Sequence, residues 1–244
     1  MPKDLFHQPL FNQSLLKKRI PAQPTPAAHK KILHDWAATI RDGSLHKQKE
    51  TSIRGPFIRK FFVELLGYKP FGEGGMEWTV HEEQQTGPGS ADAALGYFTG
   101  QHRRVVAPVE LKGGDTQNLD AIMPGRHKSP VQQAWEYAND TRDCQWVLLS
   151  NMLEIRLYAV SHTRQVYERW DILDLADSDA EYQRFRIGDV VAHPLDHRPG
   201  ERHDHPRLLG QRDELRRRHR APRQMRPAHQ GLDLGDAGAV EVDD

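Results

Sequence analysis

The spacing of hydrophobic and polar positions predicts helices and strands through the middle of the chain. Residues 27–40 carry apolar side chains at intervals of three and four, which predicts a helix that ends near Gly43. Residues 51–66 repeat this spacing with Phe and Leu and predict a second helix. Short apolar runs bounded by turn residues predict three strands, over residues 77–83, 91–98 and 104–112.

The pattern after residue 112 adds one helix and three strands. Residues 130–139 predict a helix with Pro130 in its first turn. The continuous apolar run of residues 145–150 is typical of a buried central strand, and residues 152–160 and 165–170 predict a hairpin. This order predicts an α/β (α+β) domain in which helices flank a mixed β-sheet.

The two ends of the chain differ from the middle. Residues 1–26 end in a proline-rich stretch and indicate an N-terminal arm and linker, so the folded domain is expected over residues 27–187. Residues 188–244 contain no aromatic residue and no Ile, so we expect them to bury too little apolar surface to fold. Their bias toward Arg, His, Asp, Pro and Gly suggests translation of a GC-rich gene in a shifted frame, or a genuine disordered tail.

Charge and cysteine content exclude several classes of protein. The 34 basic and 34 acidic residues give a formal net charge of zero, so a nucleic-acid function must rest on a local site. The single Cys144 excludes a disulfide framework and a zinc ribbon. No apolar run approaches the length of a membrane span, and a cytoplasmic protein is expected. Four histidines lack a predicted frame that would make them a metal site: His193, His197, His203 and His205.

Two carboxylates and a lysine stand at the ends of two neighbouring predicted strands. Glu110 and Lys112 are two residues apart, so they point to the same face of a strand. A hairpin turn at residues 99–102 would bring Asp92 close to that face. The three side chains are therefore expected to converge at one edge of the sheet.

This combination suits a Mg²⁺ site. Mg²⁺ prefers hard oxygen ligands and keeps several waters, so Asp92, Glu110 and the backbone carbonyl of Leu111 would suffice to hold it. Such a metal activates water against a phosphodiester, while Lys112 would orient the water, assist its deprotonation or neutralise developing charge. Taken alone, Glu-x-Lys is common in charged sequences and is more typical of a surface ion pair at a strand end.

The strings around these residues resemble the PD-(D/E)xK nucleases, through GSADAALGYF at residues 89–98 and APVELKG at residues 107–113. Gln133 and Tyr137 match the Q-x-x-x-Y element of the RecB-like branch. With FFVELLGY, SPVQQAWEYAND and WVLLSNMLEIRLYAV, the resemblance covers roughly residues 5–186. It is to the N-terminal nuclease domain of type IIG and type I-like restriction-modification enzymes.

The resemblance implies a restriction-endonuclease-like core, Mg²⁺ as cofactor with Mn²⁺ as a substitute, and double-stranded DNA bound through its phosphate backbone. It also implies that Gln133 and Tyr137, on one helical face, line the site; packing between helix and sheet is the alternative for both. Glu50 stands where nucleases of this fold often supply another acidic ligand, with helix capping as the alternative.

Other polar residues are weaker candidates for contacts with phosphates. Asn151 and Arg156 lie around the turn after the central strand. Five basic residues flank the proposed edge, where binding of the DNA backbone and a solvated charged loop are equally compatible: Arg103, Arg104, Arg126, His127 and Lys128.

The leading hypothesis is a Mg²⁺-dependent DNA endonuclease of a restriction-modification system. In that family a helical connector, a methyltransferase and a target-recognition domain follow, and no Asn-Pro-Pro-Tyr-like motif occurs here, so a truncated nuclease half is expected. Any cleavage would then be non-specific, and double-strand cleavage would need a transient dimer on DNA. The alternatives are a catalytically silent remnant of a disrupted restriction gene and a non-catalytic module that binds DNA or protein.

Overall fold

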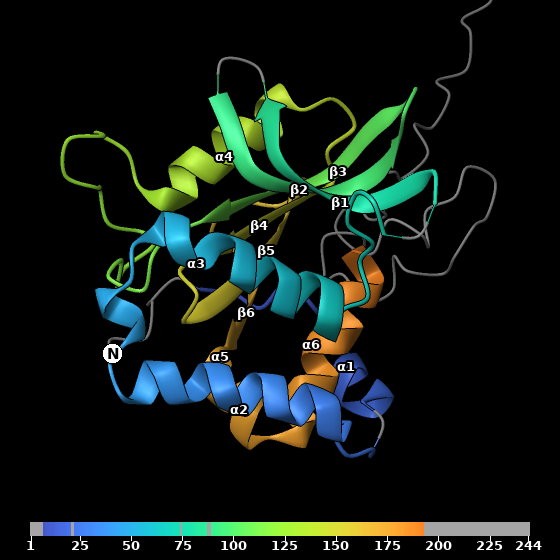
Figure 1. Ribbon diagram of the computed structural model, residues 1–244, viewed down its shortest axis with the longest axis vertical. Helices are drawn as coiled ribbons and strands as arrows, with labels where there is room; N and C mark the ends of the chain where they lie inside the picture. Colours follow the sequence, from blue (N-terminus) through green and yellow to red (C-terminus); the bar gives the residue numbers. More distant parts are fainter. Residues whose placement is uncertain (1–6, 21, 74, 87–88, 193–244) are drawn as a thin grey trace, which may run out of the picture. The chain divides into compact units, whose positions relative to one another are not determined.

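A six-stranded mixed β-sheet forms the centre of the fold. The computed structural model describes residues 7–20, 22–73, 75–86 and 89–192. Neighbouring strands pair antiparallel except β3 and β4, which run parallel (Figure 1). The strands lie in chain order across the sheet: β1 (Glu77–Thr86), β2 (Gly89–Thr99), β3 (Arg103–Leu111), β4 (Trp146–Ser150), β5 (Glu154–Ala159) and β6 (Tyr167–Asp171). The predicted mixed sheet with flanking helices is confirmed.

Helices cover both faces of this sheet. Side chains of β4 and β5 alternate between two hydrophobic cores: Leu148 and Leu157 belong to the larger core, Val147 and Leu149 to the smaller one. None of the helices in the described ranges combines the length and apolarity needed to span a bilayer. The helical elements are α1 (Gln13–Arg19), α2 (Ala27–Arg41), η1 (Leu45–Lys47), α3 (Glu50–Phe57), η2 (Ile58–Leu65), α4 (Pro130–Asp140), α5 (Ile172–Asp177) and α6 (Asp179–Ala192).

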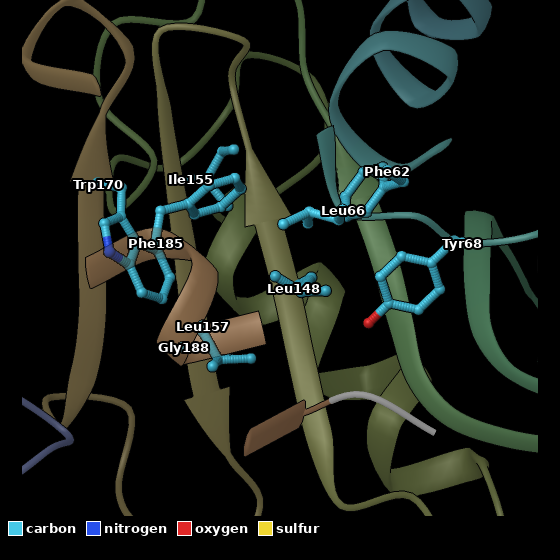
Figure 2. Close-up of a pocket in the computed structure, with 9 residues that line it drawn as sticks. All are labelled: Phe62, Leu66, Tyr68, Leu148, Ile155, Leu157, Trp170, Phe185 and Gly188. Carbon is cyan, nitrogen blue, oxygen red and sulfur yellow. The ribbon is translucent and has the colours of Figure 1, made fainter. Parts of the chain in front are cut away.

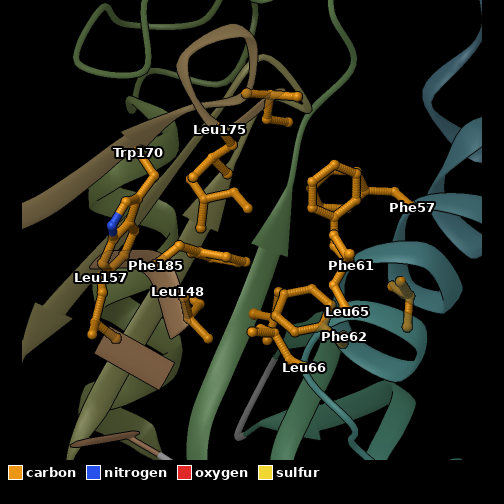
Figure 3. Packing of buried hydrophobic residues seen from close by; sticks show 14 of the residues in the cluster. Phe57, Phe61, Phe62, Leu65, Leu66, Leu148, Leu157, Trp170, Leu175 and Phe185 are labelled. Carbon is orange, nitrogen blue, oxygen red and sulfur yellow. The ribbon is translucent and has the colours of Figure 1, made fainter. Parts of the chain in front are cut away.

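Helix α4 covers the smaller core alone, while the other helices enclose the larger one (Figure 1). On the larger side, aromatic residues of η2 and α6 meet Leu148 and Leu157 of the sheet (Figure 3). Phe57 and Phe61 stack with ring centroids 4.4 Å apart. This layer fixes α3, and with it the residues of α3 that face the end of β3.

The second predicted helix forms, but its hydrogen bonding changes along its length. It begins as α3 and continues as η2, which is a π-helix. Pro56 lies inside α3 and has no amide N–H to donate, so one helical bond is lost just before the helix widens. The π-helical turn keeps Phe61, Phe62 and Leu65 buried.

The N-terminal segment belongs to the core, so the prediction that residues 1–26 form an arm and linker is wrong for residues 7–20. Leu10, Phe11 and Leu16 are all at most 1% exposed. Gln8 bridges to Val166 beside β6, and the Phe11 amide N–H donates to the buried Glu168. The partners of these residues lie some 150 residues later in the sequence, so no local pattern predicts these contacts.

The C-terminal boundary lies later than residue 187, because α6 continues to Ala192. A Cβ on Gly188 would lie 2.4 Å from the Trp170 ring, so the helix packs closely against the sheet there. Neither α5 nor α6 was predicted. The rest of the expected tail, residues 193–244, with its four histidines and its suspected frame shift, lies outside the described residues.

Candidate active site

Asp92, Glu110 and Lys112 converge because of one irregularity in the β2–β3 hairpin. Leu95 pairs with Ala107 and Gly96 with Val105, so the register shifts by one residue between them. Beyond this bulge Ala93 faces Val109, and the same register sets Asp92 level with Glu110 on one face. Without the bulge, Asp92 would be level with Val109 and Glu110 would point to the opposite face. The predicted convergence therefore rests on a single extra residue in β3.

Gly96 makes this bulge possible, because a Cβ at that position would lie 2.0 Å from the Arg104 carbonyl oxygen. We expect Gly96→Ala to lower the free energy of unfolding by about 1–3 kcal/mol, as the strands must part to admit the methyl group. Urea denaturation measures the loss. Gly100→Ala in the turn of the same hairpin, where nothing lies within 4 Å of the added carbon, is the matched control. Equal midpoints for the two variants would contradict the steric argument.

Asp92 is held by two donors. The Leu111 amide N–H donates to its Oδ2 at 2.8 Å, and Arg54 Nη1 donates to its Oδ1 at 2.8 Å. Arg54 also pairs with Glu83 on β1 through Nη2, at 2.7 Å. Neither Arg54 nor Glu83 was among the predicted site residues. The only signal for Arg54 was its position four residues after Glu50, which places both on one face of α3.

Glu110 and Lys112 form a buried ion pair, only 2% and 5% exposed. Lys112 Nζ bonds to Glu110 Oε1, whereas Oε2 of the same carboxylate is buried and has no hydrogen-bond partner among the described residues. The pKa of Glu110 is raised to about 7: burial raises it most, Lys112 opposes the rise, and the nearby carboxylates of Asp92 and Glu50 add to it. An orphaned carboxylate oxygen in this position favours a cation that the protein itself does not supply.

Glu50 lies beside this cluster, at the beginning of α3. Its Oε2 accepts the Gly113 amide N–H at 3.2 Å, directly after β3. Its negative charge contributes to the raised pKa of Glu110. The structure thus brings Glu50 to the predicted place, and its present bond is to backbone.

Gln133 and Tyr137 lie on α4, which a capping box of Ser129 and Gln132 begins. Gln133 is buried, and its Nε2 donates to Tyr137 Oη at 2.8 Å. The Tyr137 ring lies against Gly89 at the beginning of β2, where a Cβ would be 2.6 Å from it. Gln133 and Tyr137 therefore lie on the side of the sheet that α4 covers, as Glu110 does. The negative charge of Glu110 also interacts with the positive charge of Lys128, just before α4.

The basic candidates do not lie together. Arg103 and Arg104 begin β3 and pair with Phe98 and Tyr97, so the strand separates Arg103 from Glu110 by roughly 23 Å. The expectation that both arginines flank the site is wrong. Arg126 lies near the site, since its Nη1 approaches Gln133 Oε1 at 3.5 Å.

Asn151 and Arg156 are structural, and their expected contact with phosphates has no support. Asn151 is buried and caps the turn after β4 by accepting the backbone N–H groups of Leu153 and Glu154. Arg156 is 4% exposed and pairs with Glu154 and Asp120.

The apolar hollow of the larger core is a packing feature and no second site. A cavity of about 20 Å³ lies between η2, the sheet and α6, with Phe62, Leu148, Leu157 and Trp170 among its walls (Figure 2). This volume is that of about one water molecule. Its walls are apolar and aromatic side chains, and the Tyr68 hydroxyl is not joined there by a carboxylate, imidazole or thiol.

The donor set around Glu110 fits Mg²⁺. Within the described ranges, no three His, Cys, Asp or Glu side chains are grouped as a complete metal site. Mg²⁺ is usually bound through one or two carboxylates, with waters in its other positions. Asp92 and Glu110 supply such a pair, and the orphaned Oε2 of Glu110 is the atom that a metal would satisfy.

Comparison with protein-family models, with curated proteins and with solved structures found no match for this chain. The topology of the sheet therefore establishes the fold class, and a function has to be argued from the site itself. The resemblance to restriction nucleases stays a prediction.

Proposed function

We propose that this domain is a Mg²⁺-dependent DNA endonuclease of the PD-(D/E)xK type, related to the nuclease domains of restriction-modification enzymes. One observation carries the proposal: Asp92, Glu110 and Lys112 share one end of the β2–β3 hairpin, where Glu110 Oε2 is buried and finds no hydrogen-bond partner in the part of the chain that the structure describes. Burying Glu110 and Lys112 beside the largely shielded Asp92 costs stability, and a site with a purely structural role would not require these charges.

Asp92 and Glu110 would hold the metal, with the Leu111 carbonyl and Glu50 as further oxygen ligands. When bound, Mg²⁺ or its substitute Mn²⁺ lowers the pKa of a water and neutralises charge on a phosphodiester. The bond from the Leu111 amide to Asp92 orients that carboxylate and brings the Leu111 peptide beside it.

Lys112 is positioned by burial and by its bond to Glu110. Its ammonium would orient the attacking water and offset the negative charge that develops on the phosphate. Gln133 and Tyr137 hold each other on α4 and would present amide and hydroxyl groups to the DNA backbone.

Double-stranded DNA would be bound through its phosphates. Arg126, His127 and Lys128 precede α4 and are at least partly exposed, beside Gln133. Phosphate contacts position DNA without reading its sequence. Cleavage is therefore expected to be non-specific and to weaken steeply as salt rises.

A plasmid-nicking assay with the full chain tests the proposal. We expect conversion of supercoiled to nicked DNA in Mg²⁺ or Mn²⁺ and none in chelator. Asp92→Asn should reduce the rate by roughly a thousandfold, since a charged metal ligand is lost. Asp35→Asn, which alters an exposed carboxylate paired with Lys31, should cleave like the wild type.

Equal nicking by the wild type and Asp92→Asn would overturn the mechanism. Retention of DNA by the wild type without any nicking would favour a non-catalytic DNA-binding module. Discrete fragments from plasmid would contradict binding through phosphates alone.

A further inference from the structure

Arg54 binds one of the Asp92 carboxylate oxygens that the proposed metal would use. Its Nη1 donates to Asp92 Oδ1 at 2.8 Å, and the other Asp92 oxygen is taken by the Leu111 amide. Both side chains are shielded from solvent, with 14% exposure for Asp92 and 23% for Arg54. A charge-assisted bond in such surroundings is among the stronger polar contacts in a protein.

A divalent ion and this guanidinium compete for the same carboxylate. A metal that takes Asp92 Oδ1 must displace Arg54 Nη1, and the two cations would repel each other at close range. Without the metal, Arg54 and Lys112 are the cations that contact Asp92 and Glu110. Arg54 therefore neutralises Asp92 as Lys112 neutralises Glu110. Of these two cations, Arg54 also pairs with a second carboxylate that is exposed to solvent.

That second partner keeps Arg54 at the site after displacement. Glu83 on β1 is 71% exposed and accepts Arg54 Nη2 at 2.7 Å. Glu83 adopts a positive φ of 54°, which only a few per cent of non-glycine residues do. A guanidinium released from Asp92 stays tethered to Glu83 with its remaining N–H groups free, and such groups match the oxygens of a phosphate.

We propose that Arg54 is a cationic latch of the nuclease site: it neutralises Asp92 in the metal-free protein and moves onto the DNA phosphate when a metal binds. This inference rests on the proposed nuclease function. It assigns Arg54 opposite effects on two measurable quantities, because the residue opposes metal binding and assists cleavage. A purely structural arginine would change both in the same direction or neither.

Calorimetric titration of the metal-free, full-length chain with Mn²⁺ measures the first effect. We expect Arg54→Ala to bind Mn²⁺ roughly tenfold more tightly than the wild type, since one competing charge-assisted bond is gone. Plasmid nicking at saturating Mn²⁺ measures the second effect, and should fall on the order of a hundredfold as a phosphate donor is lost. Arg54→Lys, which keeps the charge, should bind Mn²⁺ more like the wild type and recover part of the nicking.

Arg59→Ala is the matched control. Arg59 follows in the same helical run and also pairs with two carboxylates, Glu64 and Glu73, but these lie on the surface. Its replacement should alter neither Mn²⁺ affinity nor nicking. Thermal unfolding of both alanine variants shows whether the fold is kept.

The outcomes separate the latch from the nuclease. Unchanged or weaker Mn²⁺ binding by folded Arg54→Ala, in a chain whose wild type nicks DNA, would overturn the latch alone. If Arg54→Ala fails to fold, Arg54→Gln takes its place, because it keeps most of the side chain and removes the charge that competes for Asp92. Tighter Mn²⁺ binding by folded Arg54→Gln would then support the latch, and unchanged or weaker binding would overturn it. A wild type that binds Mn²⁺ without nicking would overturn the nuclease, and with it the transfer of Arg54 to phosphate.

Discussion

Glu110→Gln is expected to reduce Mg²⁺-dependent nicking on the order of a thousandfold or more while the fold is retained. The substitution keeps the shape of the side chain and an oxygen that accepts from Lys112 Nζ, but removes the charge that would hold the metal. Circular dichroism and the rate of plasmid nicking measure the two parts of this expectation. Glu64→Gln, at a partly exposed glutamate, should leave the rate unchanged.

The stability of the Glu110 variants provides a second readout. Glu110→Gln alone leaves the ammonium of Lys112 buried without its counter-charge, which is destabilising. Glu110→Gln combined with Lys112→Met removes both charges, and this pair is expected to be at least as stable as the wild type although it cannot cleave. An inactive protein that is no less stable would identify the charges as functional. Nicking by the double variant at the wild-type rate would refute the assignment.

Phe11→Ala is expected to cost about 3–5 kcal/mol of unfolding free energy, as for a fully buried phenylalanine. Phe11 is 1% exposed, and its ring approaches α6 at Gly188. Urea denaturation measures the loss. The effect would be large for a segment that resembles a linker in sequence, because the segment joins β6 and α6 from the far end of the chain.

Leu15→Ala is the control for Phe11→Ala. Leu15 lies on α1 close to Phe11, but it is 37% exposed, so its truncation should change the unfolding free energy by about 0.5 kcal/mol or less. Comparable midpoints for the two variants would mean that residues 7–20 do not contribute to the core.

Local sequence patterns determined the elements that contain enough periodic residues to reveal their faces. The α2 helix, the strands of the sheet and α4 with its Pro130 all lie within a few residues of their predicted positions. The two-residue spacing of Glu110 and Lys112 likewise placed both on one face. These features depend on neighbours in sequence, so the chain itself specifies them.

Only the tertiary structure decided the features that depend on distant partners. The bulge at Gly96 sets Asp92 level with Glu110, yet a slip of one residue leaves no trace in a strand pattern. Leu10 and Phe11 are core residues because their segment meets Glu168 of β6 and Gly188 of α6, and partners so distant in sequence leave no local signal. Arg54 meets Asp92 across 38 residues because α3 packs at the end of the hairpin. Ion pairs and cores of this kind form where the folded chain brings separate segments together, and the energy that selects them exists only in the assembled fold.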